Sequence, residues 1–448
     1  MNNILLILLA LLVMVSASHA QPAFEHRSLE EALNPDGTLK RGVQGSFKVD
    51  GYQMRTGANG EPIFLPQTQN TATGTWDTQF GLPGPGVAGV VSALAFDGQG
   101  NVYVGGIFGA VGGVSTAVNY IARYNVQTNS WSTLGTDTSN GVRVGNGVSL
   151  GAVTALAIDR QGRLYVGGTF LQAGGVSANG VARFDPATNT WSALGTGTQI
   201  GERGAGEVRA LAVDGQGRVY VGGNFTEAGG VSANAVARFD PATNSWSTLG
   251  TGAQNGVNER VNALAVDGQG RLYVGGDFTQ AGGVSANRVA RFDPATNSWS
   301  TLGTGAQNGV SGVSGGGFFL TVSALAIDGS GRVYVGGSFT QAGGVSANRV
   351  ARFDPATNSW SALGTGAQNG VSGGSFPSVY ALAVDGSGRV VVGGFFTQAG
   401  ALPHPTLRVS RLRMPLPRKR SLPMGCLTSC RQAWALTSRA FQAQALAP

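Results

Sequence analysis

Apolar and polar residues alternate over short stretches that recur along the middle of the chain. The pattern Ala-Leu-Ala-x-Asp begins at Ala263 and returns at five other places, with successive starts 53 to 62 residues apart: Ala93, Ala155, Ala210, Ala324 and Ala381. Alternation with a period of two is typical of β-strands, and self-similarity at a near-constant spacing is typical of repeat folds. We therefore expect an all-β fold built from copies of one unit.

The unit that begins at Val261 contains four predicted strands. They are Val261 to Asp267, Arg271 to Phe278, Arg288 to Asp293, and Ser298 to Leu302. An Asp-Gly turn separates the first two strands, because its glycines accept positive φ angles. Asp293-Pro294-Ala295-Thr296-Asn297 separates the last two, because proline fixes φ and the Asp and Asn side chains cap turns. Each unit is therefore predicted to form one four-stranded antiparallel sheet.

A single sheet of this composition has two apolar faces and cannot bury either face alone. Ala263 and Ala265 alternate with Leu264 and Val266, so one face of the first strand is narrow. Packing the sheets radially around an axis would bury both faces of each sheet. One tryptophan per unit is expected to add to this core: Trp131, Trp191, Trp246, Trp299 and Trp360.

The segments Tyr273-Val274-Gly275-Gly276 and Val289 to Trp299 carry a family resemblance. Their double glycine, aspartate-proline turn and spaced tryptophan resemble the kelch repeat, and the pattern is similar to the central domain of galactose-oxidase-like proteins. The resemblance covers residues 93–400 and implies a β-propeller of four-stranded antiparallel blades. We expect six blades, with seven as the alternative, and an incomplete last blade. The motif specifies a fold and says almost nothing of function.

Thr75-Trp76-Asp77-Thr78 resembles a lone fourth strand and could complete the blade that begins at Ala381. That blade would still lack its third strand, which would leave an unpaired edge. We expect the propeller to span residues 76–400, preceded by an extension over 21–75 without repeats.

The repeat stops abruptly after Gly400, where Ala401-Leu402-Pro403-His404-Pro405 replaces the expected Gly-Val-Ser-Ala-Asn. Residues 401–448 are rich in proline and contain eight basic residues but no aspartate or glutamate. A shift of reading frame near codon 400 is one interpretation, and an authentic basic tail that attracts anionic surfaces is the other. Without this segment the net charge of +7 becomes −1 over the other 400 residues. A near-neutral body gives no electrostatic reason to expect nucleic-acid binding.

The first twenty residues are typical of a secretory signal. Ile4 to Val15 is apolar, and Ser18-His19-Ala20 places small residues at a cleavage site, although the usual basic residue before the apolar run is missing. The run is shorter than the roughly 20 residues that span a bilayer. We therefore predict a signal peptide over 1–20 and a monomeric protein that is secreted or held in the periplasm or at the cell surface, without a membrane span.

Groups that perform catalysis are scarce in the repeats. The three histidines are His19, His26 and His404, and both cysteines, Cys426 and Cys430, lie in the last segment. A Ser-His-Asp triad or a histidine metal site cannot be assembled in the repeats, and the copper chemistry of galactose-oxidase-like proteins is not implied either. We expect no catalytic residue, no metal and no cofactor.

Some polar positions recur from unit to unit. Four arginines precede an aspartate by two residues and could form a ring that binds anions: Arg183, Arg238, Arg291 and Arg352. We favour a structural role instead, in which each arginine lies over the nearby tryptophan and pairs with an aspartate. The Asp-Gly-x-Gly loops lack the alternating acidic ligands of a calcium loop, and the glycine pairs lack the lysine and helix of a phosphate loop.

The connections between units differ in length and sequence, and strand alternation places them at one end of the sheets. Phe318, Phe319, Leu320 and Phe376 would be apolar points there. Variable loops on a rigid scaffold often bind partners, although neutral drift would look the same. We predict a non-catalytic binding or scaffold protein for an unknown protein or glycan. The alternatives are an extracellular enzyme that acts on polysaccharide and a broken, non-functional gene product.

Overall fold

The computed structural model describes residues 86–400 with short gaps, of which the longest are 144–151, 200–205 and 313–319, and short segments within 27–66 and at 407–409. Two compact units are present, residues 1–78 and 79–448. In the first unit β1 (Arg27–Ser28) pairs in parallel with β2 (Phe47–Lys48), and β3 (Tyr52–Thr56) forms a hairpin with β4 (Pro62–Pro66). The predicted signal peptide and Trp76 lie outside the described residues.

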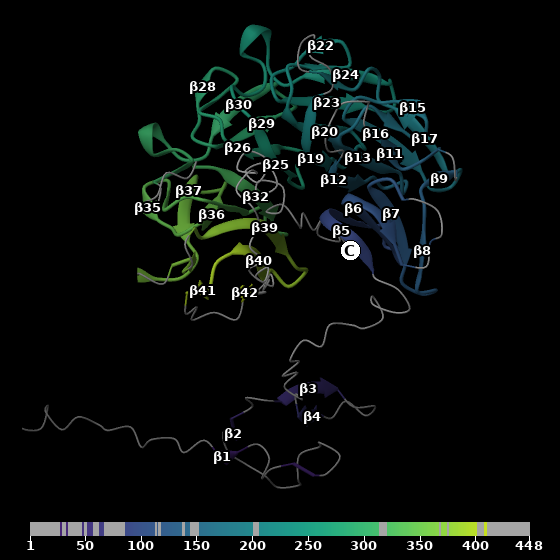
Figure 1. The fold of residues 1–448 in the computed structure, drawn as a ribbon. Helices are drawn as coiled ribbons and strands as arrows, with labels where there is room; N and C mark the ends of the chain where they lie inside the picture. The colour runs from purple at the N-terminus through teal and green to yellow at the C-terminus, as the bar shows by residue number, and fades with distance from the viewer. Residues whose placement is uncertain are drawn as a thin grey trace, which may run out of the picture. The chain divides into compact units, whose positions relative to one another are not determined.

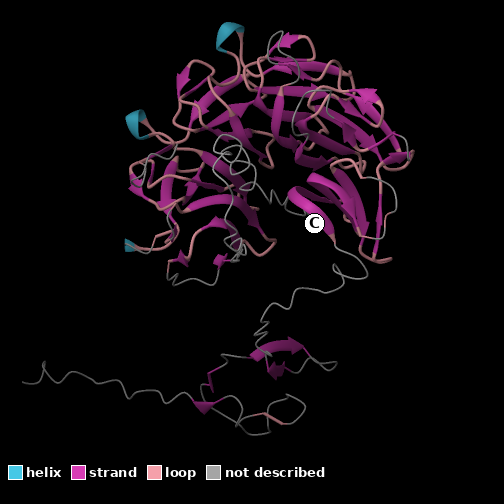
Figure 2. Ribbon diagram, viewed as in Figure 1, coloured by secondary structure: helices cyan, strands magenta, loops and turns pink. Residues whose placement is uncertain are grey.

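The described residues of the second unit form five four-stranded antiparallel sheets and a sixth sheet of three strands, besides small sheets of two or three short strands (Figures 1 and 2). The first sheet consists of β5 (Val87–Phe96), β6 (Asn101–Val111), β7 (Ile121–Asn125) and β8 (Ser130–Ser132). The second consists of β12 (Ala152–Ile158), β13 (Leu164–Thr169), β16 (Val181–Asp185) and β17 (Thr190–Ala193), and the third of β19 (Glu207–Val213), β20 (Val219–Asn224), β23 (Val236–Asp240) and β24 (Ser245–Thr248). The fourth consists of β25 (Val261–Val266), β26 (Leu272–Gly276), β29 (Val289–Asp293) and β30 (Ser298–Thr301), and the fifth of β32 (Val322–Ile327), β33 (Val333–Gly337), β36 (Val350–Asp354) and β37 (Ser359–Ala362). The strands predicted for the unit at Val261 are confirmed to within two residues at each end.

Turn chemistry explains the strand boundaries. Asp293 Oδ1 accepts a hydrogen bond from the backbone N–H of Ala295 at 2.9 Å, and Asn297 has a φ of 53°. Asparagine tolerates this left-handed conformation better than most residues do. The side chain and the backbone of the predicted turn therefore both direct the chain back into β30.

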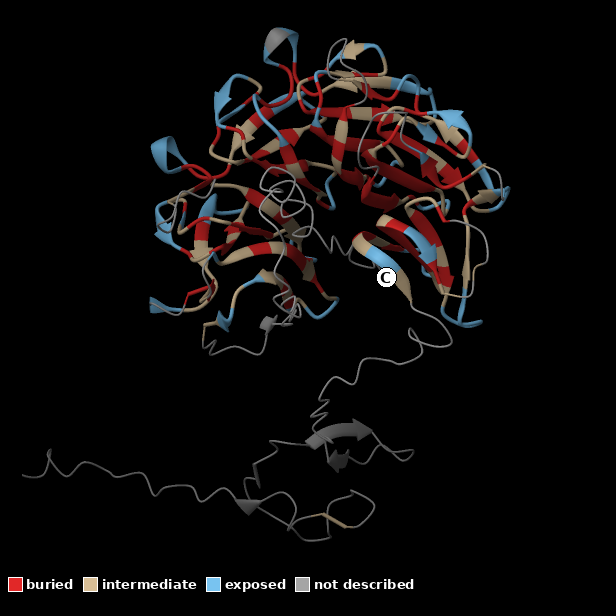
Figure 3. Ribbon diagram, in the orientation of Figure 1, coloured by how far each residue is buried: buried red, intermediate tan, exposed pale blue. Residues whose placement is uncertain are grey.

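Each sheet packs its narrow face against the broad face of the next sheet. β5, β12, β19, β25, β32 and β39 (Ser378–Val384) are the innermost strands, and each packs against its neighbour along the chain (Figure 1). Between the third and fourth sheets, Ala210 and Ala212 meet Val261 and Leu264 in one buried cluster. Figure 3 shows that the buried residues follow the strands and that the outer loops are exposed. The stacking predicted from the alternation of small and large residues is confirmed.

The double glycine near the end of each second strand has two separate steric roles. A Cβ atom on Gly275 would lie 2.4 Å from Cγ1 of Val322 in the next sheet, so this glycine permits the sheets to approach. A Cβ atom on Gly276 would lie 2.0 Å from the carbonyl oxygen of Arg260. The pairing of β25 with β26 shifts between Val261 and Ala263, so the second glycine makes room for a β-bulge.

The repeated tryptophans connect neighbouring sheets. Trp299 is 9% exposed, its ring lies 5.2 Å from that of Phe292, and its Nε1 donates a hydrogen bond at 3.0 Å to the carbonyl oxygen of Leu249 in the preceding sheet. Trp191, Trp246 and Trp360 donate to the equivalent carbonyls of Leu134, Leu194 and Leu302. The ring contact with an aromatic residue recurs at Trp131.

The sixth sheet consists of β39, β40 (Val390–Phe395) and β42 (Leu407–Val409). β42 pairs in parallel with the outer edge of β40, where the other sheets have an antiparallel third strand. The expected unpaired edge is therefore wrong, because a strand from beyond the repeats covers it. Among the described residues, β39 does not pack on β5 as consecutive innermost strands pack on each other, and Figure 1 shows the six sheets as an arc.

Candidate functional site

Two ends of the sheets carry different chemistry. At one end, which we call the connector end, the chain passes from one sheet to the next, as it does over residues 194–206 and 249–260. The opposite end carries the Asp-Gly-x-Gly loops, and we call it the turn end. At the connector end, short strands of the connections pair with the loop between second and third strands: β18 (Thr198–Gln199) with β21 (Glu227–Ala228), β31 (Val310–Ser311) with β34 (Gln341–Ala342), and β38 (Val371–Ser372) with β41 (Gln398–Ala399).

Only part of the predicted apolar surface lies within the described residues. Phe318 and Phe319 fall in the gap at 313–319. Leu320 is half-buried and packs against the core between the fourth and fifth sheets. Phe376 is 45% exposed and lies just before β39. Phe376 is therefore an accessible apolar point, whereas Leu320 contributes to packing.

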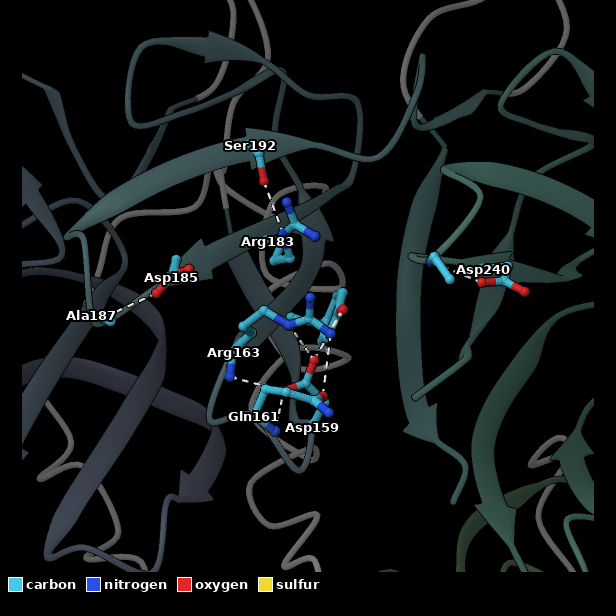
Figure 4. Close-up of polar contacts among 10 residues, drawn as sticks. Asp159, Gln161, Arg163, Arg183, Asp185, Ala187, Ser192 and Asp240 are labelled. Carbon is cyan, nitrogen blue, oxygen red and sulfur yellow. Dashed lines mark hydrogen bonds and ion pairs between the residues drawn. The ribbon is translucent and has the colours of Figure 1, made fainter. Parts of the chain in front are cut away.

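The repeated arginines form hydrogen bonds within their own sheets. Arg183 Nε donates to Ser192 Oγ at 3.1 Å, and the two residues face each other across β16 and β17 (Figure 4). Asp185 instead accepts from the backbone N–H of Ala187. The same bond to serine recurs at Arg238, Arg291 and Arg352. The expected arginine–aspartate pair is wrong for the described residues, because the cross-strand register places serine, not aspartate, opposite the guanidinium.

The turn end is chemically uniform and its carboxylates are fully engaged. Asp159 Oδ1 accepts the backbone N–H groups of Gln161 and Arg163, and its Oδ2 forms an ion pair with Arg163 Nε at 2.7 Å (Figure 4). Tyr165 donates to the same carboxylate at 3.2 Å, and burial raises the pKa of Tyr165 to about 12. The ion pair recurs at Asp214, Asp267, Asp328 and Asp385. These aspartates hold turns, and no group of acidic, histidine or cysteine side chains suited to a metal occurs in the described part of the chain.

The connector end differs from sheet to sheet. The β-bulge inserts one extra residue into each innermost strand, and this residue is Ser92, Thr154, Arg209, Asn262, Ser323 or Tyr380. Two of these side chains bond the next sheet: Thr154 Oγ1 bonds the Val208 carbonyl, and Asn262 Nδ2 donates to Thr321 Oγ1 at 3.0 Å, whereas Arg209 pairs with Glu207 of its own strand. A near-identical repeat thus places unlike side chains at equivalent positions around the inner strands.

Charged residues gather at this end in the third and fourth sheets, beside Thr321 of the fifth. Arg209 Nη2 lies 2.5 Å from Glu207 Oε2, and Arg260 Nη2 lies 2.7 Å from Asp277 Oδ2. Asp277 Oδ1 also accepts from Asn262 at 2.9 Å and from Thr321. We call this group, together with Arg288, the connector-end cluster: Glu207, Arg209, Arg260, Asn262, Asp277, Arg288 and Thr321.

Two arginines of the cluster are incompletely satisfied. The Nε atoms of Arg209 and Arg288 are buried and have no hydrogen-bond partner among the described residues. Burial lowers the pKa of both guanidinium groups, and the charge of Asp277 opposes this shift in each case. A buried, unpaired N–H costs about 1–3 kcal/mol.

Sequence reasoning missed this cluster although the signal was present. Glu207, Arg209, Arg260 and Asp277 each occupy a position at which other units carry a different residue. The residues that repeat from unit to unit are mainly those that build the sheets. A position-by-position comparison of the units identifies instead the positions at which one unit differs from the others. The cluster lies at the end of the sheets that the sequence analysis favoured for binding, but the residues predicted there were apolar loop residues.

Four segments match the model of a family described as "Domain of unknown function (DUF5122) beta-propeller": residues 162–187, 217–242, 270–295 and 329–356. Each segment covers the second and third strands of one sheet, from the second sheet to the fifth. The chain is a β-propeller. Less than half of the propeller lies in the matched segments, and the family description assigns no function. No curated protein matches the chain.

Several solved structures match parts of the chain at low sequence identity. The extracellular domain of a protein described as a hybrid two-component system of B. thetaiotaomicron is 15% identical, with a TM-score of 0.42 over 70% of this chain and 31% of that one. The xyloglucanase of Xanthomonas campestris is 20% identical, with a TM-score of 0.39 over 75% and 42%. PorZ, a bacterial surface component of the type-IX secretion system of Porphyromonas gingivalis, is 15% identical, with a TM-score of 0.41 over 76% and 42%. The chain spans less than half the length of each of these three proteins. Among the described residues, no helix is long and apolar enough to cross a membrane.

Proposed function

We propose that this propeller is an exported, non-catalytic binding protein that recognises a protein or glycan partner at its connector end. The observation that carries the proposal is the contrast between the two ends. At the turn end every sheet presents the same saturated aspartate, whereas at the connector end equivalent positions carry Arg209, Asn262 or Tyr380. Because the sheets fold alike with different side chains at these positions, folding does not depend on the identity of those side chains.

The carboxylates of the connector end support binding rather than catalysis. A polysaccharide hydrolase uses a pair of carboxyl groups, one of which donates a proton. Glu207 and Asp277 are each already paired with an arginine, and Asp277 is also bonded to Asn262 and Thr321. Carboxylates held in this way have limited freedom to approach a sugar ring. The enzyme alternative would need these ion pairs to open.

The apolar run Ile4 to Val15 supports export. The repeat motif supports a kelch-like or galactose-oxidase-like type of propeller, which is a finer assignment than the family match. The broken-gene alternative concerns residues beyond Gly400. Translation of the other two reading frames of the downstream DNA tests it, because a frame shift requires a further Val-Ala-Arg-Phe-Asp-like unit there.

Two matched triple variants test the binding surface. The connector-end variant carries Arg209→Ser, Asn262→Ser and Tyr380→Ser, which imitate Ser92 and Ser323 at the same position. The turn-end variant carries three exposed glutamines changed to serine, which imitate Ser330 and Ser387: Gln161, Gln216 and Gln269. Circular dichroism would establish that both variants fold.

The proteins are passed over immobilised polygalacturonate, hyaluronan, xylan, cellulose, collagen and mucin. We expect wild type and the turn-end variant to be retained equally on at least one surface and the connector-end variant to be retained about tenfold less, as the loss of one charged hydrogen bond alone would produce. Equal retention of the two variants would refute the assignment. Release of reducing ends from a polysaccharide, lost in Glu207→Gln, would establish the enzyme instead.

A further inference from the structure

A small cavity at the connector end of the first sheet is open to solvent. It has a volume of about 220 Å³ and lies between the last part of β6 and the segment that leads into β7. None of its described lining residues is charged, and none belongs to the connector-end cluster. These residues are Ile107, Phe108, Gly109, Val118, Asn119 and Tyr120.

The cavity exists because the first sheet departs from the repeat at the lining positions. Gly109 stands where the second to fifth sheets carry a side chain: Leu171, Thr226, Thr279 and Thr340. A Cβ atom on Gly109 would approach only the carbonyl oxygen of Val118, at 3.9 Å, so the missing side chain leaves open space. Ile107 makes the adjoining wall apolar, whereas the same four sheets have polar residues at its position: Thr169, Asn224, Asp277 and Ser338.

Tyr120 is the third departure from the repeat. Its φ is 65°, and its backbone N–H donates to the Phe108 carbonyl at 3.0 Å. Gly180 makes the same bond to Phe170 in the second sheet, with a φ of 69°. Glycine adopts this conformation freely, whereas a bulky residue is strained in it, and such strain is common where a side chain holds a ligand. The tyrosine packs against the core between the first two sheets and also lines the cavity.

The volume of the cavity limits its occupant. Pockets that hold whole small ligands usually measure about 300–1,000 Å³, whereas an apolar cavity of about 150 Å³ accepts benzene. The cavity of the first sheet therefore has room for one phenyl or indole ring.

The lining of the cavity favours an aromatic ring over a sugar or a charged group. A buried charge needs a partner, and the described lining supplies none. The hydroxyls of a sugar ring need hydrogen-bond partners too, and the amide N–H groups of Asn119 already donate to Asn140. The ring of Tyr120 can instead pair with an incoming aromatic ring in a stacked or edge-to-face arrangement.

We propose that this cavity binds an aromatic side chain of a protein partner, which contacts Ile107, Val118 and the ring of Tyr120. This inference rests on the proposed function and names the partner class: an uncharged polypeptide segment that presents a phenylalanine or a tryptophan. Aromatic anchors that fill pockets in this way carry much of the binding energy of protein interfaces.

The test measures the binding of single-ring probes to the full chain by ligand-observed NMR titration. The probes are N-acetyl-tryptophanamide and N-acetyl-phenylalaninamide, and the controls are N-acetyl-alaninamide and methyl β-D-glucoside. Burial of one ring predicts a dissociation constant of about 1 mM for the aromatic probes. We expect both controls to bind at least tenfold more weakly.

Three variants locate the site. Gly109→Leu copies Leu171 and fills the cavity. Tyr120→Ala copies Ala235, which has a φ of 60°. Thr226→Leu is the control, because it adds the same side chain at the exposed equivalent of Gly109 in the third sheet. We expect the first two variants to weaken binding of the aromatic probes about tenfold or more and the control to bind them as wild type does. Circular dichroism checks the fold, and Gly109→Leu alone decides the test if the loss of tyrosine packing unfolds the first sheet.

Several outcomes would overturn the inference. Failure of both aromatic probes to bind, or equal binding of the alanine probe, would exclude recognition of a ring. Binding of the glucoside that Gly109→Leu abolishes would assign the cavity to glycans, and aromatic binding that survives in Gly109→Leu would place the site elsewhere. If the aromatic probes fail to bind but the connector-end variant still loses retention on the immobilised surfaces, this inference fails and the proposed function stands.

Discussion

The indole hydrogen bond between sheets offers a quantitative test of the packing. Trp299→Phe keeps an aromatic ring against Phe292 but removes the donor to the Leu249 carbonyl. The lost bond contributes about 0.5–1.5 kcal/mol, because the Leu249 carbonyl keeps the hydrogen bond that it accepts from the backbone N–H of Gly256. We expect Trp299→Phe to lower the free energy of unfolding by about 1–2 kcal/mol, which includes the smaller buried ring area. Trp299→Ala, which also opens a cavity, should cost about 3–5 kcal/mol or more.

Trp131 is the matched control. It has the same ring contact, with Tyr124 at 5.0 Å, but lies in the first sheet, and its indole N–H has no hydrogen bond within the described residues. Trp131→Phe should therefore cost less than about 1 kcal/mol, since only ring area is lost. Urea unfolding followed by circular dichroism measures both variants. Equal losses for Trp131→Phe and Trp299→Phe would refute the view that the indole links adjacent sheets.

Two further predictions follow from steric and electrostatic features of the same interfaces. Gly275→Ala should destabilise the protein by about 1–3 kcal/mol because its Cβ atom would lie 2.4 Å from Val322 Cγ1. Gly268→Ala should be neutral, because a Cβ atom there would meet nothing within 4 Å. Equal thermal stability of the two variants would contradict the close approach of the sheets. Burial raises the pKa of Tyr165 to about 12, from an ordinary value of 10.0, so its contribution to stability is fully present below pH 10 and is lost as the pH rises to about 12. Tyr165→Phe should flatten this alkaline loss in urea titrations, and an unchanged pH profile would show that the tyrosine is not the cause.

The repeated units could be predicted from the sequence because each boundary is set locally. Asp-Gly turns, the Asp-Pro-Ala-Thr-Asn turn and the alternation of alanine with leucine or valine all act within a few residues. The structure confirms the strands of the unit at Val261 and the stacking of alanine faces on larger side chains. The family match confirms the propeller.

Features that depend on partners far apart in the chain could not be read in the same way. Arg183 bonds Ser192 rather than Asp185 because of the cross-strand register. The parallel strand Leu407–Val409 joins an edge that the repeat pattern leaves empty. The connector-end cluster combines residues from three sheets, and only the packing of those sheets brings Arg209 and Asp277 into electrostatic contact.

Cross-linking between neighbouring sheets tests the central claim most directly. In a Cys426→Ser, Cys430→Ser background, Gly275→Cys and Val322→Cys are introduced together. An ideal Cβ at Gly275 lies 3.2 Å from Val322 Cβ, so a separation of a few tenths of an ångström brings the pair into the range of about 3.5–4.5 Å that a disulfide spans. We predict that this pair forms an intramolecular disulfide in the folded protein on mild oxidation, seen by mass spectrometry. A chain in which both thiols stay free would contradict radial packing of the sheets, and with it the gathering of unlike residues at the connector end.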